Sequence, residues 1–425
     1  MIRQLVIQNF KSIVKETIPI GRFTVMIGEN GAGKSNILEA LVMASAASKG
    51  KLERELLIGR GIRVPHPQLM RSAFNSSLKD RPIKISITHD NNSESLQELS
   101  FSITHDGDPY SDWKVLRPDI NQFDKQITKL IESKLDTLSK EDQDKERKAF
   151  QTEAKVLLKL ISESLNNTTS LNDNRNNERS QQKKVVNIES RLFPILLRGI
   201  IENSNIERFT VYAPEYYTLR NFISEGQTSP LGTRGEGLLQ LLSTMYEKES
   251  DRFQSINDGL KLLGWFNGID TTSLSKNSSE NRILVKDRFI KRRGILLDQI
   301  STNEGFLFCL FYLTLLTSKS TPNAFAIENI ETGLNPKLTE ELIKLLKKLG
   351  IKYKKQVIVS SHSPSVLDAL NLDDQDDVLL AVDRNLDGHT RVTRINKPRN
   401  LTGKTTRLSE LFLKGLIGGV PKNFL

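Results

Sequence analysis

The stretch from Gly28 to Ser35 places the strongest constraint on what this chain can fold into, because it joins a strand pattern to a helical one. It reads G-E-N-G-A-G-K-S and lies between the apolar segments 23–27 and 37–42. Glycines at these spacings let backbone N–H groups surround one anion, and a helix that starts at the loop adds partial positive charge. The stretch therefore predicts an α/β fold with a phosphate-binding loop.

The individual side chains of this loop fit a nucleoside triphosphate. Lys34 is expected to reach the β- and γ-phosphates, and the Ser35 hydroxyl is placed to bind Mg²⁺. A glycine-rich turn that binds nothing is the alternative, but all eight positions fit the motif in the strand-to-helix context that it requires. The expected nucleotide contacts come from Asn30, Gly31, Ala32, Gly33, Lys34, Ser35 and Asn36.

Two further apolar strands end in polar side chains. Segment 324–328 ends in Glu328, and segment 356–361 is followed by His362. A carboxylate at the end of a strand beside the phosphate loop is what Mg²⁺ binding requires, directly or through water. A histidine after a strand is usually structural, but its place downstream of Glu328 favours contact with the γ-phosphate and the attacking water.

The residues Asn303, Glu304 and Gly305 precede the apolar helical segment 306–316. A helix N-terminus can present N–H groups to a phosphate, but in isolation this stretch is an ordinary helix start. Elsewhere, alternation in 82–88 and 99–104 predicts an antiparallel strand pair, and 378–382 with 391–395 predicts a hairpin.

The centre of the chain differs in pattern from both ends. Residues 123–161 have helical spacing, and 166–184 are polar with almost nothing apolar, which is typical of a linker. We therefore expect three parts: 1–117, an inserted helical arm and linker at 118–205, and 206–425. Whether the arm is a solvated decoration or a surface for DNA or another subunit is open at this stage.

Composition limits the class of protein. A formal net charge of +10 favours an acidic partner such as nucleic acid only weakly. The single cysteine, Cys309, excludes a disulfide framework and a cysteine-based zinc site. The N-terminus has no signal-peptide pattern, and the most apolar run, 306–316, is too short to cross a bilayer. These features predict a cytoplasmic protein without a membrane partner.

Five segments in this order resemble one family. They are the N-F-K-S of Asn9–Ser12, the loop Gly28–Ser35, the N-E-G-F of Asn303–Phe306, the I-E-N-I-E-T-G-L-N-P of Ile327–Pro336 and the S-H-S-P of Ser361–Pro364. Together they resemble ABC-type ATPases of the RecF, SMC, Rad50 and OLD-nuclease kind, the AAA_21-like group. In that family the last four segments are Walker A, the signature, Walker B with the D-loop, and the switch histidine. The resemblance covers residues 1 to about 115 and about 205 to 385.

The resemblance implies an ABC-type P-loop ATPase head with a helical arm inserted between its two lobes. It implies ATP and Mg²⁺ as ligands, adds Lys11 and Ser12 to the nucleotide contacts, and makes Gln68 a weakly anchored candidate for the metal-binding Q-loop glutamine. In such proteins the signature segment of one subunit completes the ATP site of another. A homodimer or higher homo-oligomer around ATP is therefore expected, with residues 303–305 contacting the mate's ATP.

Three residues depart from the family pattern. Glu328 replaces the usual Asp of Walker B, Asn329 replaces the glutamate that acts as general base, and Asn303 replaces the signature serine. An amide orients a water molecule but does not accept its proton, so slow or regulated hydrolysis is expected unless Glu331 or His362 takes over. The candidate catalytic residues are Glu328, Asn329, Glu331 and His362.

The finer resemblance is to ATPase subunits of two-component antiphage systems, of the Septu and retron-associated PtuA type, whose nuclease is a separate HNH protein. The residues after the 391–395 strand are too few for a Toprim domain, so any nuclease is expected to act from another chain. The leading hypothesis is an ATP-gated subunit that regulates such a nuclease in antiviral defence. Two alternatives are a RecF-like repair ATPase that binds DNA directly and a non-hydrolysing scaffold.

Overall fold

The computed structural model of the protein describes most of the chain outside its centre. The chain forms two compact units, one of residues 1–90, 96–115 and 205–425, and a second of 91–95 and 116–204. Almost all of the second unit, including the helical arm and linker expected at 118–205, lies outside the described residues. The boundaries expected at 117 and 205 stay a prediction. The described residues are 1–50, 52–74, 78, 81–90, 96–108, 111–116, 205–221, 230–274, 282–292, 294–397 and 407–417.

A six-stranded sheet carries the phosphate loop, in the order β14-β13-β3-β12-β11-β7. Five strands run parallel, and only the edge strand β14 pairs antiparallel, with β13. Every residue of β3 and β12 is buried, as expected for strands covered on both faces. The strands expected at 23–27, 324–328 and 356–361 are confirmed, and so is the C-terminal hairpin expected at 378–382 and 391–395. The strands are β3 (Phe23–Gly28), β7 (Val211–Tyr212), β11 (Ala324–Ile327), β12 (Gln356–Ser361), β13 (Asp377–Arg384) and β14 (Thr390–Ile395).

A second sheet is antiparallel, in the order β2-β1-β4-β5-β6. The predicted pairing of 82–88 with 99–104 is confirmed, with Ile87 opposite Leu99. Strand β2 was not predicted, because its central residues Lys15 to Thr17 are polar and carry no buried stripe. The strands are β1 (Ile2–Phe10), β2 (Ile13–Pro19), β4 (Ile83–Asp90), β5 (Leu96–Thr104) and β6 (Lys114–Leu116).

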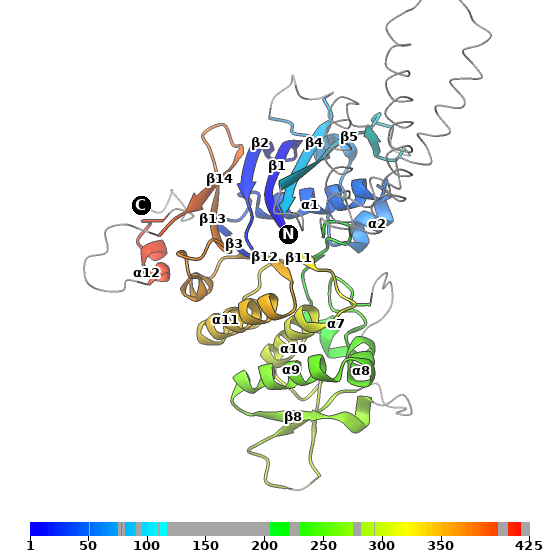
Figure 1. Ribbon diagram of the computed structural model, residues 1–425, viewed down its shortest axis with the longest axis vertical. Coiled ribbons are helices and arrows are strands. Elements are labelled where there is room, and N and C mark those ends of the chain that lie inside the picture. The colour runs from blue at the N-terminus through cyan, green and yellow to red at the C-terminus, as the bar shows by residue number, and fades with distance from the viewer. Residues whose placement is uncertain are drawn as a thin grey trace, which may run out of the picture. The chain divides into compact units, whose positions relative to one another are not determined.

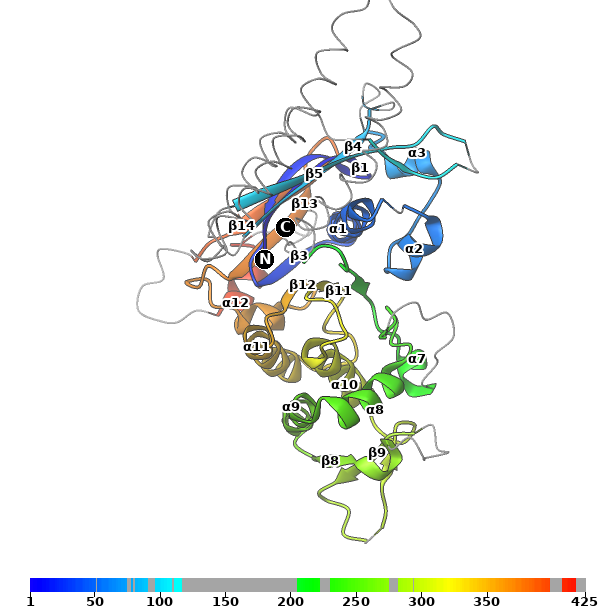
Figure 2. The ribbon, with the colours of Figure 1, turned by 45° about the vertical axis from the view of Figure 1, so that its right-hand side comes forward.

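Helix α1 (Lys34–Ser48) lies between these two sheets (Figures 1 and 2). It contacts β1, β4 and β5 of the antiparallel sheet and β3 and β7 of the parallel sheet. Because both faces are covered, almost the whole helix is buried, and it has no polar side to give an amphipathic pattern. The start of this helix, and therefore Lys34, is held at a fixed place by both sheets.

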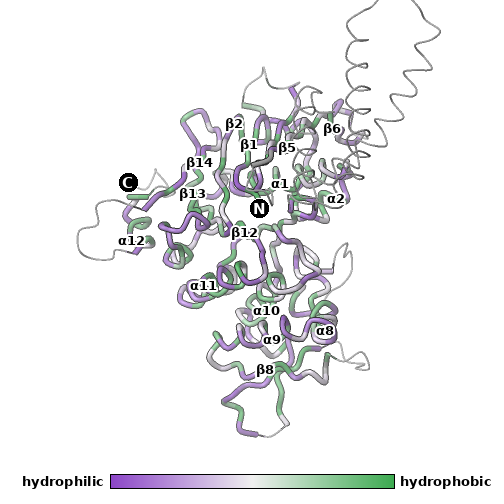
Figure 3. Tube along the Cα trace, in the orientation of Figure 1, coloured by the Kyte–Doolittle hydropathy of each residue, from purple (hydrophilic) through white to green (hydrophobic). Residues whose placement is uncertain are grey.

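A helical layer packs below the parallel sheet in the view of Figure 1. Its centre is α10, which contacts α7, α8, α9 and α11 and is buried on all sides after its first turn. Figure 3 shows the hydrophobic colouring along α10. Among the described residues, none of the helices has both the length and the apolar character needed to cross a bilayer. The helices of this layer are α7 (Tyr216–Asn221), α8 (Leu238–Lys248), α9 (Ser250–Leu260), α10 (Glu304–Thr317) and α11 (Pro336–Lys352).

Shorter elements complete the unit. A three-stranded sheet, β10-β9-β8, was not predicted because its strands are short and interrupted by charged residues. The remaining elements are β8 (Phe266–Asp270), β9 (Leu284–Asp287), β10 (Leu297–Asp298), α2 (Arg54–Gly59), α3 (Pro67–Met70), α12 (Leu408–Leu413) and the 3-10 helices η2 (Lys261–Leu263), η3 (Thr271–Leu274) and η4 (Pro364–Ala369).

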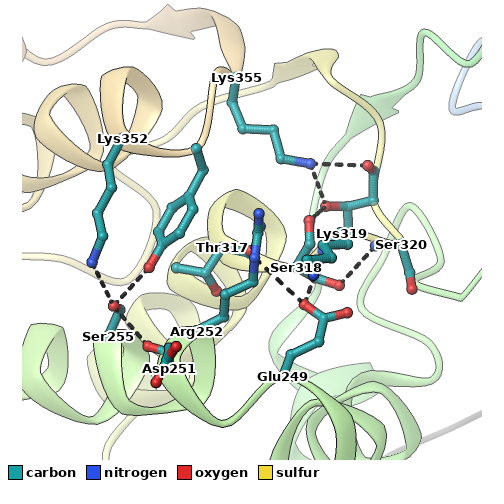
Figure 4. Close-up of polar contacts among 12 residues, drawn as sticks. Glu249, Asp251, Arg252, Ser255, Thr317, Ser318, Lys319, Ser320, Lys352 and Lys355 are labelled. Carbon is teal, nitrogen blue, oxygen red and sulfur yellow. Dashed lines mark hydrogen bonds and ion pairs between the residues drawn. The ribbon is translucent and has the colours of Figure 1, made fainter.

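The loop that joins α10 to β11 is held by the buried Lys355 and the partly buried Arg252 (Figure 4). The Lys355 ammonium, only 1% exposed, donates to the carbonyls of Thr321 and Pro322 at 2.9 and 3.0 Å and to the Thr321 hydroxyl at 3.1 Å. Arg252 donates to the Thr317 carbonyl at the end of α10. Burial, together with the nearby charge of Arg252, lowers the pKa of Lys355 to about 7. The end of α10 and the start of β11 are therefore joined by contacts from α9 and from Lys355, just before β12.

Candidate nucleotide-binding site

The loop between β3 and α1 has a backbone that requires glycine at two positions. Gly28 has φ 154° and Gly33 has φ 112°, both unfavourable for a residue with a side chain. A Cβ at Gly28 would collide with the Val382 carbonyl, and one at Gly33 with the Thr390 hydroxyl. The loop is therefore shaped by close approach to the β13–β14 hairpin as well as by its own turns.

Lys34 points back into this loop. Its ammonium donates to the carbonyls of Gly28 and Glu29 at 2.8 and 2.9 Å, and the residue is 7% exposed. Burial lowers its pKa to about 8, and the carboxylates of Glu331 and Glu328 oppose this shift. A buried ammonium held by carbonyl oxygens gains strongly from an anion, because charge interactions are less screened there. The arrangement suits a phosphate group.

Glu328 follows β11 at the edge of the sheet where the parallel strands end. Strand β12 separates β11 from β3, so these strand ends lie at the same edge as the phosphate loop. The backbone N–H of Glu328 donates to the Tyr212 carbonyl at 2.8 Å, and its side chain is half-buried within electrostatic reach of Lys34. The predicted carboxylate thus lies on the loop side of the sheet.

The next residues form a tight turn that returns toward β12. The Thr332 N–H donates to the Asn329 carbonyl at 2.9 Å, and the Asn329 N–H donates to the Ser360 hydroxyl at 3.2 Å. One Glu331 carboxylate oxygen accepts from the His362 N–H at 2.8 Å. The other is buried and has no hydrogen-bond partner among the described residues. The Asn329 side chain is exposed.

His362 lies within electrostatic reach of Lys34. Burial lowers the pKa of the imidazole, and the Lys34 charge lowers it further, so the ring is neutral near neutral pH. The structure therefore brings four of the predicted residues together around the loop: Lys34, Glu328, Glu331 and His362.

Ser12 and Asn36 lie beneath the loop and brace it. The Asn36 amide donates to the Ser12 hydroxyl at 2.7 Å, and that hydroxyl is 2.6 Å from the Thr390 hydroxyl. Lys11, with φ 48°, pairs with the buried carboxylate of Glu39, and its pKa is lowered by burial. These contacts support the loop; direct nucleotide contact by these side chains stays a prediction.

Two residues of the C-terminal hairpin hold the loop and were missed from the sequence. The Thr390 hydroxyl donates to the Ala32 carbonyl at 2.8 Å, and the Arg384 guanidinium donates to the Gly31 carbonyl at 2.8 Å. The hairpin itself was predicted, but no local signal marks a contact across some 350 residues. The carbonyls of Gly31 and Ala32 are thus engaged by the hairpin and not by the ligand side of the loop.

The expected signature segment caps α10. The Asn303 side-chain oxygen accepts from the Phe306 N–H at 2.8 Å, as an N-cap residue does. Asn303 and Glu304 are exposed and, with Gly305, line a pocket of about 640 Å³. The D-loop residues Gly333 and Asn335 line the same pocket, and no phosphate-loop residue does. The lining residues are Leu262, Leu263, Gly264, Trp265, Asn303, Glu304, Gly305, Gly333, Asn335, Lys337, Leu338 and Glu341.

The oxygen donors present fit a magnesium ion that arrives with a nucleotide. Ser35 supplies a half-exposed hydroxyl at the start of α1, and Glu328 supplies a carboxylate; both are hard donors of the kind Mg²⁺ takes. In the described part of the chain, no group of three or more His, Cys, Asp or Glu residues forms a ready metal site. Gln68 is exposed on α3, where no described contact links it to Ser35, so its metal role stays a prediction.

Comparisons with known proteins agree with this geometry. A family model described as an AAA domain matches residues 4–195. A model described as an AAA domain, putative AbiEii toxin, Type IV TA system, matches residues 304–368. An SMC head bound to the C-winged helix domain of ScpA is 14% identical with a TM-score of 0.50, over 93% of this chain and 97% of that chain.

Two further SMC heads are similar. The head domain from Thermotoga maritima is 12% identical with a TM-score of 0.43, covering 93% of this chain and 99% of that one. An Smc head with an extended coiled coil, bound to the C-terminal domain of ScpA derived from Pyrococcus furiosus, is 14% identical with a TM-score of 0.48, covering 93% and 96%. The fold predicted from the sequence is confirmed by the first of these heads, at a TM-score of 0.50. The two AAA-domain matches and this fold support a P-loop ATPase head of the ABC type, like those of RecF, SMC and Rad50.

Proposed function

We propose that the chain is an ATP-binding ATPase subunit that dimerises around ATP and regulates a separate nuclease in antiphage defence. One observation carries the first half of this proposal. The loop with Lys34 and the pocket at Asn303 are separate surfaces of one chain. No phosphate-loop residue lines the pocket, so one chain alone does not bring Lys34 and the signature segment to the same place. A second copy related by a twofold axis would bring the two surfaces together twice, which gives two composite sites.

The charges of the two surfaces favour this pairing. The loop side gathers the Lys34 ammonium with two carboxylates, whereas the Asn303 side offers an exposed amide and the N-terminus of α10. A triphosphate between them would neutralise Lys34 on one side and meet helix N–H groups on the other. The bound nucleotide then stabilises the dimer of two heads.

Measurement of molar mass with and without nucleotide tests this part. The full chain is expected to shift from monomer to dimer when Mg²⁺ and ATP are added, and not with ADP. Lys34→Ala should remove the shift by weakening phosphate binding, whereas Lys354→Ala, at an exposed lysine away from the loop, should retain it. A wild-type chain that stays monomeric in saturating ATP, or a Lys34→Ala chain that dimerises equally, contradicts the proposal.

The proposed role in defence rests on the resemblance of this chain to the ATPase subunits of two-component antiphage systems. The family model over 304–368 carries a toxin–antitoxin description, which is consistent with a role against phage. A plaque assay on cells that express this chain together with an HNH nuclease encoded beside it tests the role. Protection that needs both proteins and is lost in Lys34→Ala supports the proposal. Equal protection by Lys34→Ala contradicts it.

A second candidate function, direct nucleic-acid binding as in RecF-like repair ATPases, has its own supporting observation. The loop after β9 exposes Arg288, Lys291 and Arg292 around Phe289, whose side chain is 65% exposed. Cations beside an exposed aromatic ring suit a nucleic-acid strand. Reversing these three charges should then weaken DNA binding and flatten its salt dependence, compared with reversal of the exposed lysines 319, 348 and 354.

A further inference from the structure

We propose that Glu331, and not the residue at position 329, takes the proton from the attacking water when ATP is hydrolysed. The inference rests on the proposed ATP site and specifies its chemistry. The residue that the family uses for this step is here Asn329, whose amide does not accept a proton. Three side chains near the loop remain as candidates: Glu331, His362 and Glu328. Their surroundings distinguish them.

Glu331 holds one carboxylate oxygen in place and leaves the other without a partner. The first oxygen accepts from the His362 N–H at 2.8 Å, while the second, Oε2, is buried with no partner among the described residues. An unpaired buried carboxylate oxygen is costly unless a partner arrives. A water molecule beside the γ-phosphate is such a partner.

The turn that carries Glu331 is anchored at both ends. Ile330 is fully buried and its N–H donates to the Ser360 carbonyl at 3.3 Å, while the Thr332 hydroxyl donates to the Asn329 carbonyl at 2.8 Å. Asn329 itself is in the left-handed region, with φ 49°, and its side chain is exposed. The backbone therefore turns position 329 outward and fixes position 331 against the end of β12.

Hydrogen bonding separates Glu331 from His362. The His362 side chain is engaged with the Gly28 backbone, and burial and the Lys34 charge lower the pKa of the imidazole. Glu331 instead keeps one carboxylate oxygen without a partner among the described residues. Glu328 is the carboxylate best suited to the magnesium side, because it follows β11 directly at the strand ends. Glu331 is therefore the remaining candidate to accept the proton from the attacking water.

The step balances with the water as the only co-reactant. The water oxygen forms a bond to the γ-phosphorus as the bond between that phosphorus and the bridging oxygen breaks. The water proton moves to Glu331 Oε2, and the bridging electron pair stays on the ADP β-phosphate, beside Lys34. Glu331 then returns the proton to the released phosphate or to solvent.

Single-turnover hydrolysis by the full chain, measured with ATP binding and dimer mass, tests the assignment. Glu331→Gln keeps the size of the side chain and an oxygen that can accept from the His362 N–H, so the fold should survive. Hydrolysis should fall about 100-fold or more, the usual contribution of a general base, while ATP affinity stays within about threefold. The ATP-bound dimer should persist longer because ATP is no longer consumed.

Asn329→Gly tests the competing residue on the same turn, because glycine tolerates the left-handed backbone of this position. It should change hydrolysis by less than about tenfold, because an orienting amide contributes less than a base. Glu331→Asp should keep part of the rate, since a carboxylate remains. Three results overturn the inference: hydrolysis by Glu331→Gln within threefold of wild type, a larger loss in Asn329→Gly than in Glu331→Gln, or a wild-type chain that does not hydrolyse ATP. Failure of wild type to dimerise with ATP overturns instead the proposed function.

Discussion

Replacement of Lys355 by methionine is expected to destabilise the connection between α10 and β11. The ammonium makes three hydrogen bonds to the loop at 2.9 to 3.1 Å and is 1% exposed. Methionine fills much of the same space but leaves the carbonyls of Thr321 and Pro322 unpaired. Each buried carbonyl left unpaired costs about 1 to 3 kcal/mol, and removal of a buried charge offsets part of this cost. The free energy of unfolding is therefore expected to fall by about 3 kcal/mol.

The pH dependence of this loss follows from the pKa of Lys355, which is about 7 in the folded chain against 10.5 for an ordinary lysine. Between these values the unfolded chain binds a proton that the folded chain has released. The free energy of unfolding therefore rises with pH through this window, by about 1.5 kcal/mol between pH 7 and pH 8.5. Below pH 7 both states are protonated and this contribution stays constant. Lys355→Met should lack the rise.

Urea unfolding at pH 6.5, 7.5 and 8.5, with hydrogen exchange of segment 318–322, measures both effects. Lys354→Met is the matched control, because Lys354 is the exposed neighbour of Lys355 and the same charge is removed. The reasoning is refuted if Lys355→Met loses less than about 0.5 kcal/mol relative to that control. It is also refuted if the difference between wild type and Lys355→Met shrinks as the pH rises.

Three further predictions concern the nucleotide loop and the signature segment that is proposed to face it from a second chain. A mixture of Lys34→Ala and Gly305→Glu chains should recover up to half of the ATP-dependent dimer that each variant alone lacks, because one composite site in a mixed pair is intact; no recovery contradicts shared sites. Gly33→Ala should abolish binding of a fluorescent ATP analogue, since its Cβ meets the Thr390 hydroxyl, whereas Gly31→Ala, with nothing within 4 Å, should cost about 1 kcal/mol of backbone strain; equal effects contradict the steric argument. Thr390→Val should weaken ATP binding about tenfold through loss of one hydrogen bond of about 1.4 kcal/mol to the loop, as measured by titration; an unchanged affinity contradicts the bracing role.

The elements around the loop were predictable because their chemistry is local. Strand β3, the loop and α1 are contiguous, and the strands that end at Glu328 and His362 are short apolar runs bounded by polar residues. Strand β2 and the sheet of β8 to β10 were missed, because their stability comes from partners in the fold and not from an apolar run. Asn303 was predicted as a phosphate contact, and the structure adds its role as the N-cap of α10.

The parts of the site that sequence reasoning missed are those made by pairs distant in the chain. Thr390 and Arg384 have no motif, and only the pairing of β13 with β3 brings them to the loop. The special position of Glu331 likewise depends on the backbone of residue 362, because a turn and a strand end must meet before one carboxylate oxygen is held and the other is left unpaired. The sequence motifs identify Glu331 and His362, but they do not show which carboxylate oxygen of Glu331 is held and which is left unpaired.

The phosphate loop therefore depends on the last third of the chain for its shape. The glycines permit the backbone path, but the carbonyls of Gly31 and Ala32 are engaged by hydrogen bonds from β13 and β14, which follow the switch histidine. Because β13 pairs directly with β3, these bonds form only when the C-terminal hairpin has joined the parallel sheet. A loop fixed by these partners is ordered before ATP arrives, so less binding free energy is spent on ordering it and more remains to hold two heads together.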